Sequence, residues 1–197
     1  MKRFLGVACA LLILFVNAPM AFAASSSPAD AVDTENFDDA LEYISSQEVK
    51  SQIYNEIDFN KEGTQSIDVG NGIIFKYVYS ENVQSTARAY SVKSATMSGH
   101  FYLKSNGQKV ATYSLAASFH YNGSSVYALE SEVQVSSSAI SGWSVTESFS
   151  ISSGSGWTSV DASYQLYHNG NYNNDTFLDM SCDANGNITK NYQIIGK

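Results

Sequence analysis

The chain has 197 residues, of which 44% are hydrophobic and 13% aromatic, and it contains two prolines. With a mean hydropathy of −0.17, this composition excludes a disordered linker, which lacks the apolar residues for a core, and a membrane-embedded bundle, which is far more apolar. The net charge is −8, and no basic cluster is present to neutralise phosphates, so nucleic-acid binding is not expected.

The first 23 residues have the features of a secretory signal peptide. Lys2 and Arg3 precede an apolar run at residues 4–16, and small residues stand at the cleavage positions up to Ala23. The run is shorter than the roughly 20 apolar residues that a membrane-spanning helix needs. We therefore expect cleavage after Ala23, a secreted extracellular protein, and no integral membrane segment after processing.

Residues 24–62 form an acidic linker and helical segment, in which ten acidic residues oppose Lys50 and Lys61. Ser45 and Glu48 have the spacing of a capping box between two short predicted helices. The apolar residues at helical spacing are Phe37, Ala40, Leu41 and Ile44, followed by Val49, Ile53 and Ile57. The acidic faces are either solvated or a docking element for an extracellular protein.

Residues 63–197 change to a period of two, which is typical of strands with one buried and one solvated face. The predicted inward residues are Ile73, Phe75, Tyr77, Tyr79; Ala95, Met97, Gly99, Phe101, Leu103; Ala111, Tyr113, Leu115, Ala117, Phe119, Tyr121; Tyr127, Leu129, Val133, Val135; Val145, Phe149, Ile151; Val160, Ala162, Tyr164, Leu166; Leu178, Met180, Cys182; Ile188, Tyr192, Ile194. This alternation favours antiparallel over parallel strands. About eight strands with short connections predict a mainly β protein, an antiparallel β-sandwich (immunoglobulin-like or similar) behind a short N-terminal helical segment.

The register of one hairpin can be predicted from its apolar residues. A two-residue turn at Asn106 and Gly107 would place the apolar faces of the two strands on opposite sides of the sheet. A three-residue loop at 105–107, with Gly107 at positive φ, instead pairs Phe101 with Ala111 and keeps one apolar face. The same register pairs Met97 with Leu115.

Glu147, His168 and Cys182 have inward parity but are not ordinary core residues. Together they could form a thiol hydrolase with Cys182 as nucleophile. If a hairpin loop covers residues 169–175, Cys182 lies near Ala162, six residues and about 20 Å along the strand from His168. We therefore expect no catalytic residues: a buried thiol, an inward charge at a sheet edge that discourages strand addition, and a histidine at a strand end.

Asp183, Asn185 and Asn187 alternate as at the start of a calcium loop, but Gly186 is in the wrong place for an EF-hand, and a hairpin turn explains the residues better. We expect no metal site and no cofactor. The sequence leaves open whether these residues bind calcium.

An aromatic and amide-rich set is the best candidate for ligand binding. Trp157 and Tyr167 share the solvated parity of one strand, and the following stretch holds Asn169, Asn171 and Tyr172. Flat rings among amides and carboxylates can stack on sugar rings and bond their hydroxyls. The alternatives are that Trp157 folds over a sheet edge and that the stretch is a solvated hairpin. Trp143 has core parity.

Four segments resemble a pattern in short secreted β-rich proteins of Gram-positive bacteria. These segments are residues 102–113, 119–123, 141–144 and 181–186. The resemblance spans about residues 94–190 and implies a Gram-positive secreted protein. That family is uncharacterised, so the resemblance implies no activity and transfers no site residue.

The sequence therefore predicts a secreted, non-catalytic binding or surface-interaction module whose partner is a glycan or cell-surface polymer of the envelope. An alternative is a protein-protein interaction module that docks through the acidic N-terminal helices. A thiol hydrolase using Cys182 comes third. Ligand identity, oligomeric state and strand order remain open.

Overall fold

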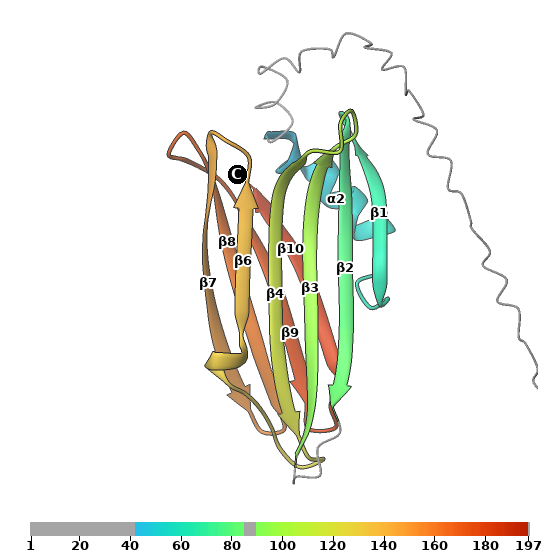
Figure 1. The fold of residues 1–197 in the computed structure, drawn as a ribbon, viewed down its shortest axis with the longest axis vertical. Helices are drawn as coiled ribbons and strands as arrows, with labels where there is room; N and C mark the ends of the chain where they lie inside the picture. The colour runs from blue at the N-terminus through green and yellow to red at the C-terminus, as the bar shows by residue number, and fades with distance from the viewer. Residues whose placement is uncertain (1–41, 85–89, 197) are drawn as a thin grey trace, which may run out of the picture. The chain divides into compact units, whose positions relative to one another are not determined.

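The computed structural model describes residues 42–84 and 90–196 (Figure 1). The chain order is α2 (Gln47–Glu56), β1 (Gly63–Gly70), β2 (Ile73–Gln84), β3 (Ser91–Leu103), β4 (Lys109–Tyr121), β5 (Val126–Ala128), the short 3₁₀ helix η1 (Glu130–Glu132), β6 (Gln134–Ala139), β7 (Trp143–Gly154), β8 (Trp157–His168), β9 (Asn171–Asp183) and β10 (Ile188–Gly196). The described residues thus form ten strands, where the spacing predicted about eight.

The strands form two antiparallel sheets that face each other, which confirms the predicted β-sandwich. Sheet A has the order β1-β2-β3-β4-β5, and β6 also pairs with β4, further along the same side. Sheet B has the order β10-β9-β8-β7. In Figure 1, sheet A lies in front and sheet B behind it, and β6 and β7 lie together at one side of the sandwich.

The period of two in the sequence fixes which side chains fill the space between the sheets. Large aromatic residues dominate this core: Phe75, Tyr77, Tyr79, Phe101, Tyr113, Phe119, Tyr164 and Tyr192 are all at most 1% exposed. The ring of Tyr192 reaches across from β10 to β3, where a Cβ on Gly99 would lie 2.5–2.8 Å from its atoms. A glycine in β3 therefore makes room for the largest side chain of β10.

The predicted register of the β3–β4 hairpin is confirmed. Phe101 pairs with Ala111, Met97 pairs with Leu115, and Gly107 has a φ of 68°. The loop is one residue longer than predicted, because the Leu103 N–H donates to the Gln108 carbonyl at 2.9 Å. The register shifts between the pairs Phe101–Ala111 and Tyr102–Lys109, so the extra residue forms a bulge in β4. As a result two consecutive residues of β4, Val110 and Ala111, are both buried.

The predicted inward parity of Tyr127 and Leu129 is wrong. Val126 points inward instead, and Tyr127 and Leu129 are 37% and 43% exposed. The reason is that the chain leaves the sheet after a three-residue β5, makes the η1 turn, and re-enters as β6 on the same edge of β4. A strand interrupted in this way cannot keep one parity across the break.

Helix α2 packs against the sandwich with its predicted apolar residues. Val49 and Ile53 are fully buried, and Figure 1 shows the helix beside β1. The Tyr54 hydroxyl accepts the Ile194 N–H at 3.0 Å, so the helix also contacts the free edge of β10. None of the described helices is long and apolar enough to cross a membrane.

The predicted capping box is wrong by one residue. Ser46, and not Ser45, is the N-cap, and its hydroxyl accepts the Val49 N–H at 3.3 Å. The Ser45 hydroxyl instead donates to the Asn173 side chain of β9 at 2.5 Å. Residues 42–44 are helical, and residues 37–41, where the rest of the first predicted helix falls, lie outside the described residues.

Candidate functional site

The outward side of sheet B, which we call the polar face, carries the predicted site residues Trp157, Tyr167 and Tyr172. Burial alternates along all four strands, so the residues of this face follow from the register. They are Ser144, Thr146, Ser148, Ser150, Ser152; Trp157, Ser159, Asp161, Ser163, Gln165, Tyr167; Tyr172, Asp175, Phe177, Asp179, Ser181, Asp183; and Thr189, Asn191, Gln193, Ile195. The face therefore combines hydroxyls, amides and carboxylates with four aromatic rings.

Trp157 is the most exposed aromatic residue of the polar face. Its side chain is 43% exposed, which confirms the predicted outward parity. The indole lies against Gly154, its partner in β7, because a Cβ at that glycine would stand 2.3–2.8 Å from three indole atoms. The ring thus lies over a sheet-edge strand and still presents surface to solvent.

Tyr167 and Tyr172 lie at the opposite end of the polar face. They are paired across β8 and β9, and their ring centroids are 6.1 Å apart in an edge-to-face arrangement. Both are partly buried. The two rings therefore support each other and form a small aromatic group beside the β8–β9 turn.

The predicted seven-residue loop at 169–175 is wrong. The turn consists of Asn169 and Gly170, with φ values of 48° and 79°, and β9 begins at Asn171, opposite His168. Asparagine followed by glycine suits a two-residue hairpin turn in which both residues have positive φ. Asn169 and Asn171 are exposed at this turn, next to the tyrosine pair.

The structure places the predicted ligand residues in two groups. Trp157 and Tyr167 are ten residues apart on β8, about 33 Å along the strand. Phe177, which the sequence analysis did not single out, lies between the groups, opposite Ser163. The predicted inward parity of Leu178, Met180 and Cys182 implies that Phe177 points outward, so this signal was present in the sequence.

Two aspartates occupy the middle of the polar face. Asp161 and Asp179 are directly opposite each other in β8 and β9, and they accept hydrogen bonds from the Ser159 hydroxyl at 2.7 Å and the Asn191 amide at 3.0 Å. Burial raises the pKa of Asp179 above its ordinary value, and the charge of Asp161 raises it further. Like charges directly opposite each other destabilise a sheet.

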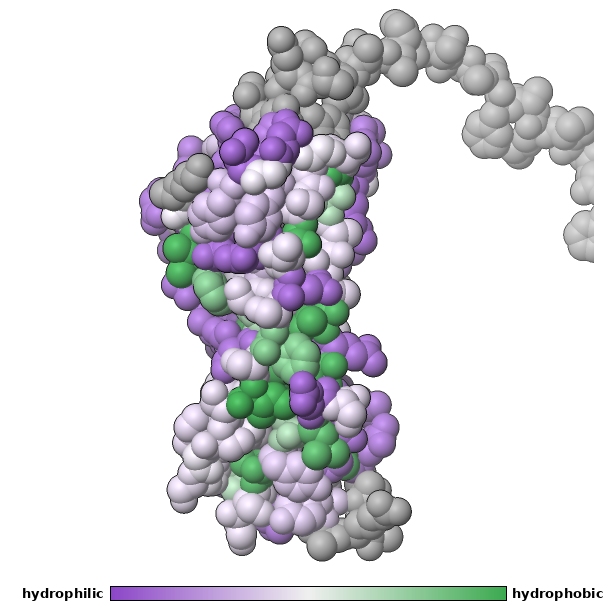
Figure 2. Space-filling view, turned by 90° about the vertical axis from the view of Figure 1, so that its left-hand side faces the viewer, coloured by the Kyte–Doolittle hydropathy of each residue, from purple (hydrophilic) through white to green (hydrophobic). Residues whose placement is uncertain are grey.

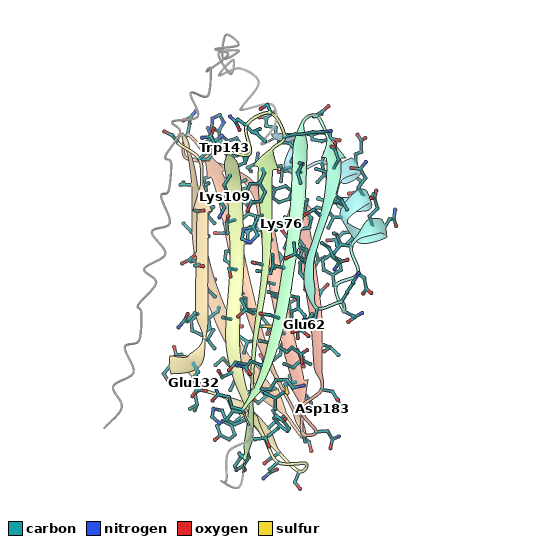
Figure 3. The ribbon with its side chains drawn as sticks, turned by 45° about the vertical axis from the view of Figure 1, so that its right-hand side comes forward. Glu62, Lys76, Lys109, Glu132, Trp143 and Asp183 are labelled. Carbon is teal, nitrogen blue, oxygen red and sulfur yellow. The ribbon has the colours of Figure 1, made fainter. Side chains whose placement is uncertain are left out.

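The polar face carries no Lys or Arg side chain among the described residues. Lys76 and Lys109 project from sheet A, the sheet nearer the viewer in Figure 3. On sheet A, His100 is hydrogen-bonded to Ser98 at 3.0 Å and to Thr112 at 3.2 Å. Burial and the two lysines lower the pKa of His100 to about 4.

A buried charged cluster, also missed by the sequence analysis, lies where β2 meets β10. Lys190 has inward parity, its side chain is 5% exposed, and its Nζ lies 3.8 Å from Glu81 and 3.8 Å from the ring centroid of Tyr79. Glu81 also pairs with Lys93 at 3.2 Å and accepts the Tyr79 hydroxyl. These contacts give each charge of the cluster a partner, as buried charges require.

The three residues considered for a thiol hydrolase are far apart. Cys182 lies opposite Thr158, ten residues of β8 and about 33 Å from His168, which is further than predicted because the turn is shorter. Burial raises the pKa of the Cys182 thiol to about 11. His168 is the last residue of β8 and stacks on the buried ring of Trp143, with centroids 4.3 Å apart.

Glu147 is exposed on β7, an edge strand of sheet B, as predicted, and its carboxylate accepts the Ser137 hydroxyl at 2.5 Å. Figure 2, which faces the side with β6 and β7, shows apolar side chains among polar ones. Val145, Phe149 and Ile151 of β7 are only partly buried there. Glu147 has inward parity but is exposed, and its charge interrupts the apolar row of an edge strand.

Asp183 organises the β9–β10 turn. Its carboxylate accepts the backbone N–H groups of Asn185 and Asn187 at 2.8 and 2.9 Å, and the Asn187 amide at 2.8 Å. These hydrogen bonds lower the pKa of Asp183. The turn therefore uses both carboxylate oxygens of Asp183 as hydrogen-bond acceptors. Among the described residues, no group of three or more His, Cys, Asp or Glu side chains could hold a metal ion.

No family model, no curated protein and no solved structure matches this chain. The Gram-positive secreted family expected from the sequence stays a prediction.

Proposed function

We propose that the protein is a secreted, non-catalytic binding module that holds a glycan or cell-envelope polymer on the polar face. Sugar rings have apolar faces that stack on aromatic side chains and hydroxyls that exchange hydrogen bonds with amides and carboxylates. The polar face offers both kinds of group on one continuous sheet.

The exposure of Trp157 carries this proposal. An indole that is 43% exposed leaves a large apolar surface in water, where its burial against a ligand is favourable. Because Gly154 supports one side of the ring, the indole is held in place before a ligand arrives. Such preorganisation lowers the entropic cost of binding.

Affinity electrophoresis tests the proposal. The wild-type protein, Trp157→Ala and Tyr127→Ala migrate through gels that each contain one polysaccharide, either cellulose ether, xylan, glycol chitin or purified bacterial wall polysaccharide. Tyr127 is a matched control, because it is 37% exposed and lies on sheet A. We expect at least one polymer to retard the wild type and Tyr127→Ala but not Trp157→Ala. Equal retardation of all three proteins, or of none in any gel, would discard the site.

A further inference from the structure

The positions of the aromatic rings along the polar face indicate the form of the ligand. Building on the proposed function, we infer that the polar face binds an extended, uncharged polysaccharide chain that runs along the strands. The chain would contact Tyr167 and Tyr172 at one end, Phe177 within the face, and Trp157 at the other end.

The distances between the rings exclude a small sugar as the ligand of the whole face. From Tyr167 to Ser163, which lies opposite Phe177, is four residues, or about 13 Å along the strand. From Ser163 to Trp157 is six residues, or about 20 Å. A single sugar ring can stack on only one of these positions, whereas a chain of linked sugars can use all of them at once.

The surface between the rings suits a chain that lies flat. All outward residues of β7 from 144 to 152 are Ser or Thr and exposed, so no large side chain stands along that edge. The central strands add carboxylates at Asp161 and Asp179, and the edge strand β10 adds an amide at Asn191. These three groups lie at one level of the face, between the levels of Phe177 and Trp157, where sugar hydroxyls can donate to their oxygens.

Charge restricts the class of polysaccharide. Asp161, Asp175, Asp179 and Asp183 lie on the polar face, and no outward position of the described strands of sheet B holds a cation. This field repels phosphate-linked and uronate polymers. A neutral chain avoids this repulsion and still supplies hydroxyl donors for the carboxylates.

The test uses neutral oligosaccharides of increasing length as probes. Isothermal titration calorimetry measures the affinity of the wild type, Trp157→Ala and Tyr172→Ala for β-1,4-linked glucose, xylose and N-acetylglucosamine oligomers from disaccharide to octasaccharide. For at least one series, we expect the wild-type affinity to rise with length until the chain spans the face. Each variant should lose about tenfold for the longest oligomers and change less for short ones, which can occupy the intact end.

Different failures separate the two proposals. Binding of one series with an affinity independent of length, or loss of long-chain binding in only one of the two variants, would overturn the extended-chain inference but leave a glycan site. Tighter binding of polygalacturonate than of neutral polymers would overturn the inference about charge. If electrophoresis and calorimetry detect no glycan at all, the proposed function itself fails.

Discussion

The indole of Trp157 lies against Gly154, the residue that faces it across the β7–β8 hairpin. A side chain at position 154 would occupy the space of the ring, so glycine there and tryptophan at 157 depend on each other. This contact holds an aromatic surface at one end of the polar face. It can be tested by a substitution at Gly154 that leaves the tryptophan in place.

Gly154→Val should impair glycan binding almost as strongly as Trp157→Ala. The Cβ of the new side chain would lie 2.3 Å from the indole Nε1, so the ring has to move. Stability should change little, because both residues are exposed. Ser136→Val, at an exposed position of β6 in sheet A, is the control. Wild-type retardation of Gly154→Val in affinity gels would show that the ring position is irrelevant.

Gly99→Ala should destabilise the sandwich without affecting the polar face. The added methyl group would lie 2.5–2.8 Å from the ring of Tyr192, which is fully buried among other aromatic rings. Overpacking of this kind costs about 1–3 kcal/mol. Urea unfolding measures the loss, and Thr96→Ala, on the exposed side of the same strand, should show none. An unchanged midpoint for Gly99→Ala would contradict the described packing of β10 on β3.

Asp179→Asn should stabilise the protein at pH 7. The pKa of Asp179 is raised in the folded state, so the wild type loses stability as the pH rises above the unfolded value of about 3.9. Asparagine removes this loss, and its amide oxygen can still accept from Asn191. Urea midpoints at pH 7 and pH 3 should show a gain for the variant that disappears in acid.

Asp161→Asn is the matched variant for this prediction. Because the two carboxylates repel each other, the double variant should gain less than the sum of the single gains. A loss of stability in either single variant at pH 7 would mean that the carboxylates do not repel each other in the fold.

His100 should make the protein less stable in mild acid. Its pKa is lowered to about 4 in the fold, whereas an unfolded histidine titrates near 6.5. The unfolded chain therefore binds more protons between these values, so stability is complete above about pH 6.5 and falls as the pH approaches 4. His100→Gln should lose less stability over this window. An imidazole NMR titration with a midpoint near 6.5 would contradict this account.

Alternation made most of the sandwich predictable from sequence. Strands such as β3 and β8 keep one parity over their whole length, so their inward residues and the Phe101–Ala111 register could be derived before any coordinates. Where a strand is interrupted, the parity has to be reset. Val126 replaced Tyr127 as the inward residue for this reason, because nothing local marks the exit of the chain after β5.

The site was only partly predictable. Parity placed Trp157 and Tyr167 outward, but their positions at opposite ends of β8 depend on the full length of the strand. The turn at Asn169 and Gly170 was read as part of a longer loop, because the Asn-rich stretch that follows has turn-like composition although the structure pairs it as strand. The burial of Lys190 depends on Tyr79 and Glu81, which are distant in sequence.

Mapping the bound glycan by NMR tests the central claim most directly. The amide spectrum of the isotope-labelled protein is recorded while the longest neutral oligosaccharide that binds is added. We predict shift changes along β8 and β9, including Trp157, Phe177 and Tyr172, with the amides around His100 unchanged. Changes confined to sheet A or to α2, with none along the polar face, would contradict the account.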